Sequence, residues 1–108
     1  MTLSIAICDD DAWHVQQIAH FVQEYLRLHR ELSGQIHTFQ HGQELLHQAE
    51  EAGGFDLYLL DIIMPELNGI QTGQQLRELG NGGEIIYLTI SPDYAIDSYS
   101  VHAFFYLP

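Results

Sequence analysis

The sequence has no lysine, one cysteine and no long apolar run. Its only permanently basic residues are three arginines, and 15 acidic residues give a formal net charge of −12. This balance argues against direct binding of nucleic-acid phosphates by the chain, because such binding depends on lysine and arginine. An anionic surface instead suits divalent cations or a basic protein partner.

The single cysteine and the apolar content indicate the class of protein and its compartment. Cys8 cannot form an internal disulfide and fits the reducing cytoplasm. No apolar run approaches the roughly 20 residues that a membrane span needs, and the start, MTLSIAICDD, lacks the basic segment of a signal peptide. With 46% hydrophobic residues, 108 residues are enough for one globular core. We therefore expect one cytoplasmic domain over residues 1–108, without membrane attachment.

Short apolar runs alternate with segments of helical spacing along the chain. The apolar runs end at acids or turn residues and predict strands at 3–8, 35–39, 55–61, 85–89 and 103–107. Apolar residues at steps of three and four predict helices at 12–32, 42–51, 70–79 and 91–100. This alternation predicts an α/β fold with a parallel five-stranded sheet and helices on both faces.

The ends of the predicted helices have local signals. Asp11 is a good N-cap for the first helix, and we expect Ser33-Gly34 to end that helix and Gly53-Gly54 to end the second. Trp13 is expected to lie partly buried beside the residues that follow the first strand. Cys8, inside an apolar run, is expected to be buried and unreactive.

Acidic and hydroxyl side chains follow three of the predicted strands. Asp9 and Asp10 follow the first strand, Asp61 ends the third, and Thr89 ends the fourth. Ligands of such sheets bind outside the carboxyl ends of the strands. Neighbouring carboxylates repel each other unless a cation lies between them, and hard oxygen ligands suit Mg²⁺. A carboxylate beside Mg²⁺ can attack phosphorus to form an acyl phosphate, with a threonine hydroxyl donating to a phosphoryl oxygen.

Three segments make the sequence resemble response-regulator receiver domains of two-component signalling. They are IAICDDD at the first strand, LYLLDIIMPELNG at the third and IIYLT at the fourth. Asp61 begins the D-x-x-M-P-x-x-x-G spacing of the family, which continues through Met64, Pro65 and Gly69. The resemblance covers essentially the whole chain and implies a flavodoxin-like, doubly wound sheet with the strand order 2-1-3-4-5.

The resemblance also implies a metal site and a switch. Asp61 would accept a phosphoryl group from a histidine kinase, beside a Mg²⁺ ion held by Asp9, Asp10, Asp61 and the backbone carbonyl of Ile63. Such a protein is not an enzyme toward other substrates, since it catalyses only its own phosphorylation and dephosphorylation.

The response to phosphorylation would reach a distant surface. Thr89 would be the switch hydroxyl and Tyr106 the switch aromatic. The face formed by the fourth helix and fifth strand would then change, controlling an output domain or a homodimer.

The tail SPDYAIDSYSVHAFFYL further resembles receivers attached to LytTR-type DNA-binding domains. By spacing, the lysine of the family would follow Pro108, so we expect a receiver cut after its fifth strand, without its fifth helix. Contact with DNA would then occur only through an output domain outside this chain. A natural deletion that leaves the switch defective is the alternative.

Two other functions compete with this interpretation. A degenerate receiver, acting by protein contact without phosphorylation, is favoured by the absent lysine and by Ile90, where the family has a small residue. A phosphatase of the haloacid-dehalogenase type would use Asp9 and Asp11 as D-x-D. Trp13 stands where that motif has threonine or valine, and a catalytic lysine is lacking.

The bulk of Ile90 leads to a first prediction. If its side chain restricts entry to the phosphoryl site, Ile90→Ala should speed labelling by acetyl phosphate and also speed hydrolysis of the label. Intact-protein mass spectrometry measures both rates. Equal labelling and hydrolysis rates in wild type and variant would contradict this role of Ile90.

Overall fold

The structure is a computed structural model that describes residues 2–88 and, as backbone, 103–107. Its strands are β1 (Thr2–Cys8), β2 (Ser33–Phe39), β3 (Leu57–Asp61), β4 (Glu84–Leu88) and β5 (Ala103–Leu107). All neighbouring strands are parallel, and they form one sheet with the order β2-β1-β3-β4-β5. The predicted fold class and strand order are therefore confirmed.

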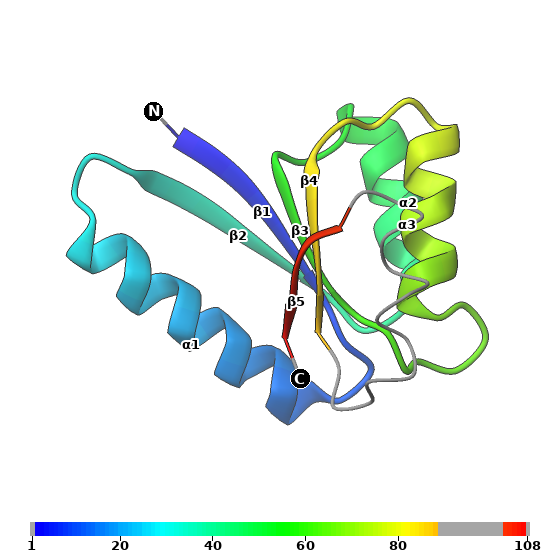
Figure 1. Ribbon diagram of the computed structural model, residues 1–108, viewed down its shortest axis with the longest axis horizontal. Coiled ribbons are helices and arrows are strands. Elements are labelled where there is room, and N and C mark those ends of the chain that lie inside the picture. The colour runs from blue at the N-terminus through cyan, green and yellow to red at the C-terminus, as the bar shows by residue number, and fades with distance from the viewer. Residues whose placement is uncertain (1, 89–102, 108) are drawn as a thin grey trace.

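Helices cover both faces of this sheet. They are α1 (Ala12–Leu28), α2 (Gly42–Ala52) and α3 (Gly69–Glu78). Figure 1 shows α1 on one side of the sheet and α2 and α3 together on the other. The helix predicted at 91–100 lies outside the described residues. Among the described helices, none is long and apolar enough to cross a membrane.

Alternation along the central strands divides the core into two layers. In β1, Ile5 and Ile7 face α1, whereas Ala6 and Cys8 belong to the layer beneath α2 and α3. The same period of two recurs in β3, and this is why these strands are apolar at nearly every position. Both layers contain fully buried side chains, which fixes the register of the sheet.

The first helix ends four residues earlier than predicted. It stops at Leu28, with His29 as its C-cap, and Ser33-Gly34 instead begins β2. Gly34 pairs with Leu3 of β1. A Cβ on Gly34 would lie 2.9 Å from the side chain of Leu26. This glycine therefore serves close packing beneath α1 and not the end of a helix.

The loop after β3 explains the spacing that follows Asp61. Met64 is 7% exposed, and the Cys8 Sγ lies 3.8 Å from its sulfur. The N–H of Gly69 donates to the carbonyl of Ile62 at 2.9 Å. A Cβ on Gly69 would lie against the backbone carbonyl of Asp61. Only glycine lets the start of α3 approach the end of β3 this closely.

The opposite, amino edge of the sheet is closed by a separate polar network. The Tyr58 hydroxyl donates to the Asn81 side chain at 2.7 Å and accepts from the N–H of Phe55 at 2.9 Å. Arg77 donates to the carbonyls of Asn81 and Gly83. These bonds hold the turn between α3 and β4 against the amino end of β3.

The α1 side of the sheet carries an open apolar groove of about 490 Å³. Its walls come from α1, β3 and β4, and the side chain of Phe21 at its rim is 71% exposed. The groove leaves apolar side chains on this face of the sheet open to solvent. Its lining side chains are Gln17, Ile18, Phe21, Val22, Leu59, Ile86 and Leu88.

The close approach at Gly69 leads to a second prediction. Gly69→Ala should lower the free energy of unfolding by about 1–3 kcal/mol, because the new methyl group overlaps backbone that cannot move aside freely. Gly82→Ala is the matched control, since a Cβ at Gly82 meets no atom within 4 Å. Urea denaturation measures both variants, and equal stabilities would contradict the packing argument.

Candidate metal centre

Three carboxylates meet at the carboxyl edge of the sheet. Asp9 and Asp10 directly follow β1, and Asp61 is the last residue of β3. One oxygen from each lies within 4.8 Å of the others. Asp9 is buried, Asp61 is half-buried and Asp10 is exposed, so the cluster has one side open to solvent. The structure thus brings together the three aspartates that the sequence singled out.

The backbone and Asp11 fix the position of Asp9. Its N–H donates to the carbonyl of Phe39 at 3.1 Å, which extends the ladder between β1 and β2 by one residue. Its Oδ1 accepts from the N–H of Asp11 at 2.9 Å, and the residue is only 4% exposed. Asp9 is therefore held rigidly, and its carboxylate stays at the floor of the cluster.

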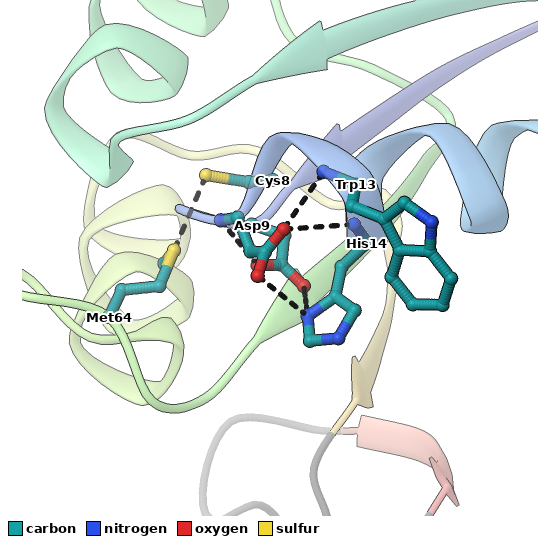
Figure 2. Close-up of polar contacts among 6 residues, drawn as sticks. Cys8, Asp9, Trp13, His14 and Met64 are labelled. Atoms are coloured by element: carbon teal, nitrogen blue, oxygen red, sulfur yellow. Dashed lines mark hydrogen bonds and ion pairs between the residues drawn. The ribbon is translucent and has the colours of Figure 1, made fainter.

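Asp11 caps α1, as predicted. Its Oδ1 accepts from the N–H of Trp13 at 2.8 Å and from the N–H of His14 at 3.3 Å. The expectation for Trp13 was wrong, because this side chain is 65% exposed. The cap places Trp13 on the outer side of the first turn, where its ring contacts the His14 ring. Figure 2 shows the indole pointing away from Asp9.

The environment of Asp61 disfavours its charge. Burial, followed by the charge of Asp9, raises the pKa of the Asp61 carboxyl from its ordinary 3.8 to about 7. A hydrogen bond from the N–H of Ile63 lowers the pKa but does not cancel these effects. Burial also raises the pKa of Asp9. A cation among these oxygens would favour the ionised forms, so the donor set fits a hard divalent ion.

His14 also belongs to this site, although the sequence reasoning did not single it out. Its Nδ1 lies 3.6 Å from Asp9 Oδ2 and 3.9 Å from Asp11 Oδ2 (Figure 2). Asp11 as N-cap puts position 14 in the first turn of the helix, beside the carboxyl edge. Its position three residues after the N-cap could have indicated that His14 lies near the aspartates. The sequence has seven scattered histidines, however, and gave no other reason to choose this one.

Cys8 lies behind the cluster and takes no part in it. The residue is fully buried, and burial raises the pKa of its thiol to about 12. The neighbouring negative charge of Asp9 adds to this shift. The thiol therefore stays protonated at neutral pH, and the prediction that Cys8 is buried is confirmed.

Several predicted site residues lie outside what the structure describes. Thr89 and Ile90 follow β4 in the undescribed segment 89–102. Tyr106 is in β5 opposite Tyr87, but only its backbone is described. Ile63 is placed at the start of the loop after Asp61, and its carbonyl as a metal ligand stays a prediction.

A doubly wound parallel sheet with carboxylates gathered at its carboxyl edge defines an α/β domain with an acidic pocket. The family profile for the response regulator receiver domain matches residues 5–108. The chain therefore belongs to the response regulator receiver domain family, a family of signalling domains.

Curated relatives and solved structures agree with this family. Accessory gene regulator protein A of Staphylococcus aureus is 26% identical over 88 residues, which are 81% of this chain and 37% of that protein. The transcriptional regulatory protein CiaR of Streptococcus pneumoniae is 44% identical over 48 residues, 44% of this chain and 21% of that protein. The chain thus spans well under half the length of these relatives.

Response regulator TrrA of Thermotoga maritima, solved in complex with Mg²⁺ and BeF, matches with a TM-score of 0.79 and 28% identity. The match covers 97% of this chain and 84% of that one. The chemotaxis response regulator CheY4 of Vibrio cholerae matches with a TM-score of 0.78 and 22% identity, over 98% and 85% of the two chains. At this identity, the match to CheY4 is evidence for the fold alone.

The raised pKa of Asp61 leads to a third prediction. Its folded pKa of about 7 exceeds its ordinary 3.8, so the folded state binds more protons between these values. Cation-free protein should therefore lose stability as the pH rises from about 4 to about 7. Asp61→Asn should reduce this loss and raise the free energy of unfolding near pH 8 by about 1–2 kcal/mol, allowing for partial exposure.

Urea denaturation in the presence of a chelator, near pH 4 and near pH 8, measures this effect. Glu50→Gln, an exposed acid on α2, is the matched control and should follow the wild type at both values. If the difference in free energy of unfolding between wild type and Asp61→Asn is the same at both pH values, the raised pKa of Asp61 is contradicted.

Proposed function

We propose that this chain is a phosphoacceptor switch of a two-component system, in which Asp61 takes a phosphoryl group from a sensor histidine kinase. The observation that carries the proposal is the cluster of Asp9, Asp10 and Asp61, whose oxygens lie within 4.8 Å of one another at the open edge of the sheet. Membership of the receiver family and the match to TrrA, a protein solved with Mg²⁺ and BeF, support it.

The carboxylates of Asp9, Asp10 and Asp61, with the backbone carbonyl of Ile63, would hold the cation. When bound, Mg²⁺ neutralises the charge that builds up on the equatorial oxygens of the transferring phosphoryl group. Asp9 is fixed by the N–H of Asp11 and is the rigid member of the set. Asp10 is exposed and can adjust, which suits an ion that keeps several water ligands.

The transfer itself would exchange one bond for another. An oxygen of the ionised Asp61 attacks phosphorus, and a new P–O bond forms while the P–N bond to the kinase histidine breaks. The bonding electron pair stays on the imidazole nitrogen, which takes a proton. Asp61 then carries an acyl phosphate, and attack by water returns the carboxylate and inorganic phosphate. The chain acts on itself and not on other substrates, so it is no enzyme in the usual sense.

The readout of phosphorylation would use residues after β4. Thr89 would donate its hydroxyl to a phosphoryl oxygen, and Tyr106 would turn inward in response. The face formed by segment 91–100 and β5 would then favour a homodimer or release an output domain. In the longer protein this output domain would be a LytTR-type DNA-binding unit in the cytoplasm. The names of two relatives, accessory gene regulator protein A and transcriptional regulatory protein CiaR, agree with a role in gene regulation.

The contacts of Asp11 disfavour the phosphatase alternative. A D-x-D phosphatase would need the carboxylate of Asp11 free for catalysis, but Asp11 Oδ1 accepts from two N–H groups at the start of α1. A degenerate receiver would keep the same fold without taking up phosphate. Chemical labelling separates this alternative from the proposed switch.

Labelling of the acceptor is the fourth prediction. Incubation with acetyl phosphate and Mg²⁺ should add one phosphoryl group per chain, and Asp61→Asn should abolish it, because the attacking oxygen is gone. Intact-protein mass spectrometry measures the added phosphoryl group. As a second measurement, ¹⁹F NMR detects beryllofluoride bound in place of the phosphoryl group. Glu50→Gln is the control and should label as wild type does. Equal labelling of wild type and Asp61→Asn would overturn the acceptor, and no labelling of wild type would favour the degenerate receiver.

A further inference from the structure

His14 is the basic side chain that contacts the acidic cluster within residues 2–88. Its Nδ1 lies 3.6 Å from Asp9 Oδ2, and Figure 2 shows the imidazole turned toward that carboxylate. Two of the arginines are bound elsewhere, Arg27 to Glu24 and Arg77 to carbonyls at the amino edge. The cluster therefore has one imidazole nitrogen beside it, in addition to its oxygens.

The backbone places His14 while leaving its ring adjustable. The N–H of His14 donates to Asp11 Oδ1, which fixes the residue in the first turn of α1. The side chain itself is 54% exposed, so little packing opposes a rotation of the ring. Asp9 Oδ1 is bound by the N–H of Asp11, and it is Asp9 Oδ2 that faces the imidazole. The imidazole ring of His14 and the carboxylate of Asp9 can thus reach the same bound ion.

We propose that His14 supplies an imidazole nitrogen to the cation held by Asp9, Asp10 and Asp61, and so shifts the preference of the site from Mg²⁺ toward ions such as Co²⁺. The inference rests on the proposed function, because it needs the divalent ion of that site. Imidazole favours late transition metals over Mg²⁺, whereas carboxylates alone suit Mg²⁺.

The distances place His14 near the position of such a ligand. Two ligand atoms of an octahedral ion lie about 3 Å apart when adjacent and about 4 Å apart when opposite, given metal–ligand distances near 2.1 Å. The 3.6 Å between His14 Nδ1 and Asp9 Oδ2 is longer than the spacing of adjacent ligands, so the ring would have to turn closer to the carboxylate to bind the same ion. The oxygens of Asp9, Asp10 and Asp61 form the group that is mutually within 4.8 Å, and His14 is not part of it, so the proposal requires a rotation of its exposed ring.

Cation titrations of the full chain test the inference. Isothermal titration calorimetry with CoCl₂ and with MgCl₂ is run on wild type, His14→Gln and His20→Gln, counting only Co²⁺ that excess Mg²⁺ displaces. His14→Gln should weaken Co²⁺ binding about tenfold and Mg²⁺ binding by less than about twofold. His20→Gln, an exposed histidine on the same helix, should change neither. The visible absorption of bound Co²⁺ should also change in His14→Gln alone.

The outcomes separate this inference from the proposed function. If His14→Gln leaves the ratio of Co²⁺ to Mg²⁺ affinity and the Co²⁺ spectrum as in wild type, His14 is no ligand, while the cation site stands. If wild type binds neither ion, or if Asp10→Asn binds both as wild type does, the cation site and the proposed function fail together.

Discussion

The parallel register of β1, β3 and β4 decides where the acidic side chains lie. Cys8 pairs with Leu60 and Asp61 pairs with Leu88, so the chain leaves all three strands at one level of the sheet. Buried side chains on both faces hold this register, because a slip by one residue would move every side chain of a strand to the opposite face of the sheet. The carboxylates of Asp9 and Asp61 therefore meet as a consequence of core packing, without direct bonds between them.

Meeting in this way costs free energy. Asp9 and Asp61 are partly removed from water, which raises the pKa of both carboxyls, and the charge of Asp9 raises the pKa of Asp61 further. The fold opposes this cost locally, with the N–H of Asp11 and the imidazole of His14 at Asp9 and the N–H of Ile63 at Asp61. A cation therefore stabilises this cluster more than it would stabilise a fully solvated one. Its charge offsets the repulsion between carboxylates that folding brings together.

Strand ends and helix caps could be predicted from the sequence, because both are set by local chemistry. The apolar runs placed Asp9 and Asp61 at one edge, and Asp11 was assigned as a cap. Features set by tertiary contact could not be predicted. Gly34 was interpreted as a helix stop, yet it serves packing beneath α1, and Trp13 turned outward. Glu66 adopts φ 66°, a left-handed conformation that nothing in its side chain suggests. Where the sequence relied on resemblance, for Thr89 and Tyr106, the switch roles stay predictions.

The hydrogen-bonded network at the amino edge lies at the end of the sheet opposite the aspartates. Tyr58, Asn81 and Arg77 fasten the turn between α3 and β4 there, roughly 17 Å from the aspartates across a five-residue strand. Gly82, at the tip of that turn, is open, because a Cβ there would meet no atom within 4 Å. A peptide epitope or fluorescent label inserted at the tip would leave the chemistry at the other edge untouched, so the turn is the natural place to attach a reporter to this domain.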